Sequence, residues 1–169
     1  MGSSNNMNGA VGPSTLPDCK SRKVYFEGDT ALNEGEALVY AFDSTVKAGR
    51  SVPGKGNSVR VPTSTYKYYF AGVAARGYKA KTGGQWIVIN LPGSVCNCLV
   101  GTASTAGTTV VVFSQTDGKF GKVTAASNEV GCGTALCLET LSAAVTGGKA
   151  ILCKLLDGND AVAPAFAAS

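Results

Sequence analysis

The chain has 169 residues, of which 44% are hydrophobic and 15% are charged, and its formal net charge is +4. This length predicts one domain whose core needs neither a metal nor a disulfide for support, and the hydrophobic content argues against disorder of the whole chain. The complete absence of histidine excludes Ser-His-Asp and Cys-His catalysis as well as imidazole metal ligands. We therefore expect a protein that is not an enzyme and that has no cofactor and no small-molecule substrate.

Residues 1–22 differ in composition from the rest of the chain. Eleven of the first twenty residues are Gly, Ser, Asn or Pro, which is typical of a segment that does not fold alone. We expect an extended N-terminal arm that becomes ordered on a partner, with its apolar residues Met7, Val11 and Leu16 in contact. Residues 23–169 are predicted to form a single β-barrel or sandwich domain.

From residue 24 onward the chain alternates between short apolar runs and turns that contain glycine. Nine runs have the length and the β-branched or aromatic content of strands: 24–26, 36–42, 59–61, 68–74, 85–91, 95–100, 108–113, 134–139 and 150–156. This spacing predicts an all-β fold, a compact sandwich or barrel of about eight to ten strands. Residues 136–145 also fit a helical period, and we favour a strand followed by a loop there.

Two segments of the chain resemble each other. Residues 35–46 and 133–145 both begin with a Gly-x-Ala-Leu strand and continue into small residues. The similarity indicates either two related halves of one barrel or a chance likeness between two amphipathic strands.

Six cysteines invite a metal or disulfide interpretation: Cys19, Cys96, Cys98, Cys132, Cys137 and Cys153. Structural zinc sites use Cys-x₂₋₄-Cys knuckles on tight turns, whereas Cys96 and Cys98 lie inside a strand-like run. Both would then face the same side of the strand and could reach a partner on a neighbouring strand. We rank buried free thiols in the core first, one or more disulfides second and a metal site last, so no metal ligand is assigned.

The charges are distributed unevenly. Residues 44–116 contain eight basic residues and no acidic one, and the remainder contains seven basic and eleven acidic residues. Tyrosines, Phe70 and Trp86 are interleaved with these bases. This pattern has three interpretations. Either the aromatic residues belong to the core while the lysines lie on loops, or the basic band docks on an acidic protein surface. The third interpretation, which ranks last, is the binding of single-stranded nucleic acid. The candidate partner contacts in this segment are Lys47, Arg50, Lys55 and Arg60.

Sequence signals for membranes and phosphate loops are missing. No apolar run reaches the roughly 18 residues of a transmembrane helix, and the first residues lack the pattern of a secretory signal. Residues 72–77 have the glycine spacing of a phosphate loop but continue with Tyr78 and Lys79 instead of Lys-Ser or Lys-Thr. We expect a protein made in the cytoplasm, without a membrane partner.

The order of several short motifs resembles a known family. The motifs are, in chain order, a Gly35-x-Ala-Leu-Val-Tyr strand, a Val61-Pro62 loop, the Phe70-Ala-Gly-Val-Ala strand, the Gln85-to-Gly93 strand ending in Pro-Gly, Gly133-x-Ala-Leu and a C-terminal strand. Between residues 34 and 156 this order is similar to that of the small β-barrel capsid decoration (cement) proteins of tailed bacteriophages.

The resemblance implies a structural virion protein made in the bacterial host cytoplasm. Proteins of this family are non-enzymatic clamps, commonly trimeric, that bind outside the shell where major capsid subunits meet. The major capsid protein would be the partner, and the outer capsid surface the location. Two other functions remain open: a nucleic-acid-binding barrel that uses the basic and aromatic band 47–86, and a carbohydrate-binding surface module that presents Trp86 and nearby tyrosines as a flat platform.

Overall fold

The computed structural model describes residues 19–42, 56–63, 69–114, 117–122 and 133–157. These residues contain ten strands and no helix, so the all-β prediction is confirmed. The strands are β1 (Ser21–Phe26), β2 (Ala37–Tyr40), β3 (Ser58–Arg60), β4 (Phe70–Ala74), β5 (Gln85–Asn90), β6 (Val95–Val100), β7 (Val110–Phe113), β8 (Phe120–Lys122), β9 (Thr134–Cys137) and β10 (Lys149–Leu155).

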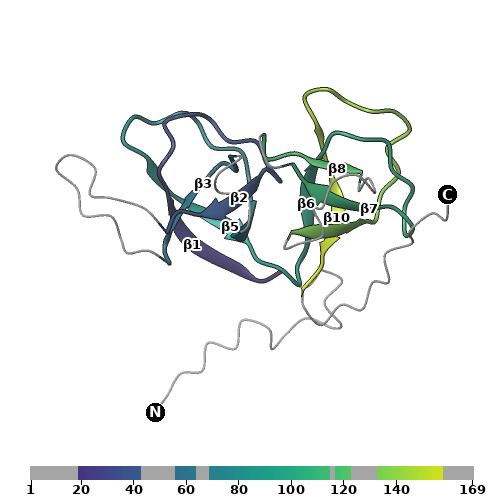
Figure 1. Cartoon of the computed structure of the whole chain (residues 1–169), viewed down its shortest axis with the longest axis horizontal. Helices are drawn as coiled ribbons and strands as arrows, with labels where there is room; N and C mark the ends of the chain where they lie inside the picture. The colour runs from purple at the N-terminus through teal and green to yellow at the C-terminus, as the bar shows by residue number, and fades with distance from the viewer. Residues whose placement is uncertain (1–18, 43–55, 64–68, 115–116, 123–132, 158–169) are drawn as a thin grey trace, which may run out of the picture.

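The strands form two closed barrels that lie side by side (Figure 1). In the first barrel the order around the ring is β1-β3-β2-β4-β5, and β1 closes the ring against β5 in an antiparallel register that runs from Ser21↔Asn90 to Phe26↔Gln85. The β1–β3 pair is parallel, whereas the other pairs of this ring are antiparallel.

The second barrel repeats this topology. Its ring is β6-β8-β7-β9-β10, with one parallel pair, β6–β8, and antiparallel pairs elsewhere. The strands β1 to β5 therefore correspond in order to β6 to β10. The sequence predicts one barrel, and the structure has two of the same topology.

The similarity between residues 35–46 and 133–145 does not mark this repeat. Gly35 precedes β2 and Gly133 precedes β9, whereas the repeat pairs β2 with β7 and β4 with β9. The likeness is therefore one between strands in non-equivalent positions. Both glycines nevertheless adopt a positive φ, which favours glycine before each strand.

Two further boundaries differ from expectation. β1 begins at Ser21, so Ser21 and Arg22 belong to the barrel and not to the predicted arm, whose residues 1–18 lie outside the described part of the chain. Strand β8 was not predicted, because a three-residue Phe-Gly-Lys segment carries no alternation of apolar and polar residues. After β9 the chain continues as a loop, as we favoured over a helix.

The barrels share part of their core. Inward-facing residues such as Val24, Phe26 and Ile87 fill the first barrel. A second apolar cluster fills the second barrel and also includes Phe70 and Val73 of β4. Every residue of β4 is buried, because one side faces the first core and the other side faces the second.

Backbone hydrogen bonds join the two barrels. The Leu99 N–H donates to the Gly35 carbonyl at 2.9 Å, and the Ala37 N–H donates to the Gly118 carbonyl at 2.8 Å. The aromatic ring of Phe70 stacks on Phe113 across the junction, with centroids 5.2 Å apart. Packing and polar contacts thus fix one barrel against the other.

Candidate partner-binding surface

Arg60 is the predicted contact residue that the described part of the chain includes. It lies on β3, where its guanidinium donates a hydrogen bond to Glu27 Oε2 at 3.3 Å in an ion pair. Their side chains are 22% and 11% exposed, so this pair is largely enclosed by the first barrel. The other predicted contacts, Met7, Val11, Leu16, Lys47, Arg50 and Lys55, lie outside the described residues.

An aromatic patch, defined as Tyr40, Phe42 and Tyr69, lies on the first barrel. Tyr40 ends β2 and packs partly on the first core. Its ring stacks on Phe42 at 5.5 Å, and the Phe42 ring meets Tyr69 edge-on at 4.9 Å. Phe42 is 41% exposed and Tyr69 is 50% exposed. Two large aromatic rings thus face outward from a well-packed base.

Backbone pairing holds this patch in place. The Tyr40 N–H donates to the Tyr69 carbonyl at 2.8 Å, which ties the end of β2 to the start of β4. The patch follows from local sequence, because Phe42 comes just after β2 and Tyr69 just before β4. Tyr69 is one of the aromatic residues that the sequence interleaves with bases, whereas Phe42 ends an apolar run, 36–42, whose pattern predicts a strand throughout and gives no sign of an exposed ring.

Trp86 on β5 forms a second exposed aromatic site. It is 50% exposed, and the ring of its cross-strand neighbour Tyr25 meets it edge-on at 5.7 Å with an interplanar angle of 78°. Lys23 Nζ lies 5.5 Å from the Trp86 ring centroid, a cation–π distance. Trp86 is exposed as the carbohydrate interpretation requires, but Tyr25 and Trp86 do not form a flat platform.

Phe70 and Tyr78, two further aromatic residues of the basic segment, face inward or cover the core. Phe70 is buried between the barrels. The Tyr78 hydroxyl accepts a hydrogen bond from the Val88 N–H at 2.8 Å, and Arg76 lies over the Tyr78 ring at 5.2 Å. Tyr66 and Tyr68 lie outside the described residues. The aromatic residues of this segment are therefore divided between core and surface.

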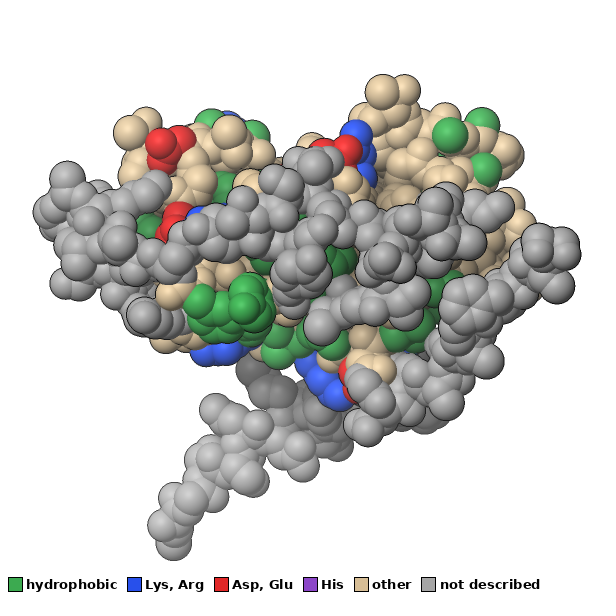
Figure 2. Space-filling model, in the orientation of Figure 1, with side chains coloured by type: hydrophobic (Ala, Val, Ile, Leu, Met, Phe, Trp, Pro, Cys, Tyr) green, Lys and Arg blue, Asp and Glu red, His purple; other side chains and the backbone are tan. Residues whose placement is uncertain are grey.

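Hydrophobic side chains are visible on the surface of the molecule. Figure 2 shows them gathered on the lower part of the displayed face, with Lys or Arg side chains along the lower margin. Four large hydrophobic side chains are exposed among the described residues: Phe42, Tyr69, Trp86 and Leu138. Three of the four belong to the first barrel, so the apolar surface is concentrated there.

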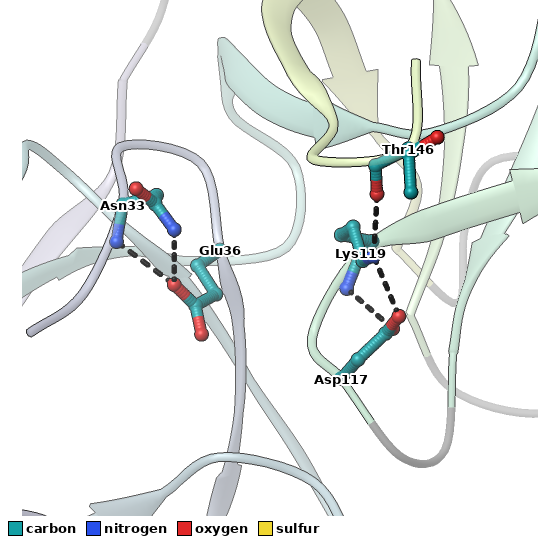
Figure 3. Close-up of polar contacts among 5 residues, drawn as sticks. All are labelled: Asn33, Glu36, Asp117, Lys119 and Thr146. Carbon is teal, nitrogen blue, oxygen red and sulfur yellow. Dashed lines mark hydrogen bonds and ion pairs between the residues drawn. The ribbon is translucent and has the colours of Figure 1, made fainter. Parts of the chain in front are cut away.

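Two separate sets of polar contacts lie near the junction of the barrels (Figure 3). Glu36 Oε2 accepts hydrogen bonds from the Asn33 backbone and side-chain nitrogens at 2.8 and 3.2 Å. Lys119 pairs with Asp117 at 2.9 Å and donates to the Thr146 carbonyl at 2.8 Å. The Asn33–Glu36 contacts lie within the first barrel and the Lys119 contacts within the second, so each set holds a turn of its own barrel.

Burial raises the pKa of Glu36 above its ordinary value, and the negative charge of Asp117 adds to this effect. The residue as a whole is only 7% exposed. Its hydrogen bonds with Asn33 hold the turn before β2, while its burial makes the charged form of the carboxyl group unfavourable. Glu34, its neighbour in sequence, accepts a hydrogen bond from Asn97 Nδ2 of the second barrel at 2.8 Å. Both carboxylates therefore have structural partners.

Among the described residues, every cysteine except Cys19 lies in the second barrel. Cys96, Cys98, Cys137 and Cys153 are buried, as their interpretation as core residues predicts, whereas Cys19 is exposed. Cys132 lies outside the described residues. Within the described residues no group of three or more cysteine, aspartate or glutamate side chains is arranged to hold a metal ion.

None of the described residues forms a helix of the length and apolarity needed to cross a membrane. A comparison with models of protein families found no match to the chain, and a search of curated proteins found no match either.

Proposed function

We propose that the chain is a capsid decoration protein, which attaches to the outer surface of a viral shell and holds neighbouring major capsid subunits together. The observation that carries the proposal is the aromatic patch: two rings that are 41% and 50% exposed on a closed, well-packed barrel. Exposed aromatic side chains on a rigid base are typical of the centre of a protein–protein interface, where they supply most of the binding energy.

The chain places positive charge next to the patch in sequence. Phe42 is followed by residues 43–55, which include Lys47, Arg50 and Lys55, and Tyr69 is preceded by residues 64–68, which include Lys67. Basic residues this close in sequence to an apolar patch favour a partner with an acidic surface. The expected partner surface is therefore an acidic region of the major capsid protein.

The architecture supports a mechanical role. Each of the ten described strands has a neighbour on both sides, because both rings are closed. Closed barrels with a shared core form a stiff body, and a stiff body transmits force between the subunits that it joins. Trimers of such a body would present three patches at one point of the shell, which increases the overall affinity through multivalency.

A second candidate function is the binding of single-stranded nucleic acid. The observation that favours it is Trp86, which is half exposed and has Lys23 over its ring at 5.5 Å. Nucleic-acid-binding barrels combine such rings, on which bases stack, with basic side chains. Here the Tyr25 edge and Lys23 occupy space beside the ring, so a base would have to displace Lys23.

The experiment uses shells of the virus that encodes the chain, prepared without it, and measures occupancy by quantitative mass spectrometry. Phe42→Ala combined with Tyr69→Ala should reduce the affinity for shells about tenfold or more, as the loss of interface hot spots does. Trp86→Ala is the matched control, since Trp86 is as exposed as Tyr69 but lies outside the patch. It should bind like the natural chain.

Unchanged occupancy of the patch variant would overturn the proposal. A gel shift of single-stranded DNA at physiological salt that is lost in Trp86→Ala would instead favour the second candidate.

A further inference from the structure

Three of the four buried cysteines of the second barrel form a row across adjacent strands, and the fourth lies two residues further along β6. Cys153 on β10 lies directly opposite Cys96 on β6 and directly opposite Cys137 on β9. Cys98 is two residues from Cys96 and therefore faces the same side of β6. Three adjacent strands thus present their thiols at one level of the barrel, with Cys153 in the middle.

The hydrogen-bond pattern distinguishes the two partners of Cys153. The Leu138 N–H donates to the Leu152 carbonyl, and the Leu156 N–H donates to the Thr134 carbonyl, at 2.9 and 3.0 Å. Cys153 and Cys137 are therefore a non-hydrogen-bonded pair, for which the Cα atoms lie about 4.5 Å apart and the side chains approach closely.

The pair with Cys96 has the other geometry. The Leu155 N–H donates to the Ser94 carbonyl, so the alternation along this ladder makes Cys153 and Cys96 a hydrogen-bonded pair, with Cα atoms about 5.5 Å apart. Both spacings lie within the range that disulfides span, roughly 4.4–6.8 Å. The closer side chains favour Cys137 as the partner.

We propose that Cys153 and Cys137 are a peroxide-sensitive dithiol, which hydrogen peroxide converts to a disulfide that links β9 to β10. The chemical class of the oxidant follows from burial. All four thiols are buried, so the oxidant has to be about the size of a water molecule.

The electrostatics of the thiols assign their roles. Hydrogen bonds from Cys137 and then Cys98 lower the pKa of Cys153 below its ordinary value, which favours the reactive thiolate at this position. The same contact with Cys153, together with burial, raises the pKa of Cys137, which therefore keeps its proton. Cys153 is the attacking sulfur and Cys137 the resolving one.

The reaction balances in two steps. The Cys153 thiolate attacks one peroxide oxygen, the O–O bond breaks, and the leaving hydroxide takes up a proton to become water, which leaves a sulfenic acid on Cys153. The Cys137 sulfur then attacks the Cys153 sulfur, the S–O bond breaks, and the second oxygen leaves as water with the Cys137 proton. Two thiols are oxidised, and one peroxide is reduced to two waters.

The test treats the reduced, folded full chain with hydrogen peroxide, removes the excess with catalase, alkylates the remaining thiols and maps disulfides by mass spectrometry of a non-reduced digest. The expected product is a Cys137–Cys153 link that dithiothreitol reverses. The closed loop is short, so its formation should raise the Tm by about 5–10 °C.

Two variants make the assignment specific. Cys98→Ala should retain the Cys137–Cys153 link, and Cys137→Ala should abolish it and leave Cys153 as sulfenic acid or linked to Cys96. Cys19, which is exposed, serves as an internal standard for peroxide exposure.

Two results would overturn the proposal: Cys153 fully alkylated under conditions that oxidise Cys19, or a Cys96–Cys153 link as the main product of the natural chain. Both are read on the natural chain, so the proposal stays falsifiable if a variant does not fold.

Discussion

At the scale of single residues, two fully buried serines differ in whether their hydroxyl groups form hydrogen bonds. Ser94 Oγ accepts a hydrogen bond from the Lys20 N–H at 2.8 Å and donates one to the Lys20 carbonyl at 3.0 Å. Ser58 is equally buried, but its Oγ has no hydrogen-bond partner within the part of the chain that the structure describes. A buried hydroxyl without a partner retains the cost of losing its hydration.

Alanine at these two positions should therefore have different effects on the free energy of unfolding. Ser94→Ala removes the partner of the part-buried Lys20 N–H and should cost about 0.5–1.5 kcal/mol, whereas Ser58→Ala should leave stability unchanged or increase it. Urea unfolding of both variants measures the difference. Equal losses for the two variants would show that the hydroxyl of Ser58 contributes as much as that of Ser94.

Glu36 provides a prediction about pH. Burial raises its pKa in the folded chain. Hydrogen bonds from Asn33 and the charge of Lys119 lower the pKa in part, and the charge of Asp117 raises it further. The folded state therefore binds more protons than the unfolded state between the ordinary value of 4.5 and the raised value. Ionised Glu36 costs stability, and this cost appears as the pH rises through that window.

Glu36→Gln removes the charge and keeps an acceptor for both Asn33 nitrogens. We expect the variant to match the natural chain in stability at pH 4 and to exceed it at pH 7, as measured by urea unfolding at each pH. A difference between the two chains that does not change with pH would contradict the raised pKa.

At the scale of elements, glycines fix how closely the barrels approach. Gly35 has a φ of +76°, and a Cβ there would lie 2.6 Å from the Leu99 backbone nitrogen in the second barrel. Gly107 has a similar φ of +73°, but apart from its own atoms and its two chain neighbours no described residue has an atom within 4 Å of the Cβ position. A side chain at Gly107 would therefore meet only the cost of the left-handed backbone, whereas one at Gly35 would also meet the cost of a clash with the second barrel.

Gly107→Ala should cost about 1–2 kcal/mol, the penalty of a left-handed backbone for a residue with a Cβ. Gly35→Ala adds a clash with rigid backbone and should cost about 1–3 kcal/mol more. Thermal unfolding of both variants measures this. Similar losses for the two variants would mean that the barrels are not in close contact at Gly35.

The elements also show how much the sequence could predict. All nine predicted strands are present, because β-branched runs between glycine turns are a local signal. Strand β8 and the closure of two rings were missed, since Phe120–Lys122 has no such pattern and ring closure depends on the non-local pairs β1–β3 and β6–β8. For the same reason the shared face of Cys96 and Cys98 was predictable, but their alignment with Cys153 was not.

The candidate surface was predictable only in part. The basic band and its aromatic residues are visible in the sequence, but alternation along β4 and β5 does not decide which ring faces solvent. Phe70 is buried because a second barrel covers that side of β4, and Tyr69 one residue earlier is half exposed. The separation of these two neighbours depends on the packing of the barrels, which local sequence does not contain.

At the scale of the whole molecule, the shared core predicts that the barrels unfold together. Phe70 of the first barrel stacks on Phe113 and meets Phe120 edge-on at 6.4 Å in the second. Phe70→Ala should lower the free energy of unfolding by about 3–5 kcal/mol. It should also lower the Tm of a single transition in which both barrels unfold. The exposed Phe42→Ala, its control, should change stability far less. Two separate calorimetric transitions in the natural chain would show that the junction does not couple the barrels.

The measurement that tests the proposed function most directly is quantitative mass spectrometry of virus particles purified from cells that express the gene of this chain in its native genome, before and after labelling of exposed lysines on intact particles. A decoration protein should be present in many copies per particle, and its lysines should react while the particle remains closed. Absence of the chain from purified particles, or its presence only after the shell is opened, would contradict the account.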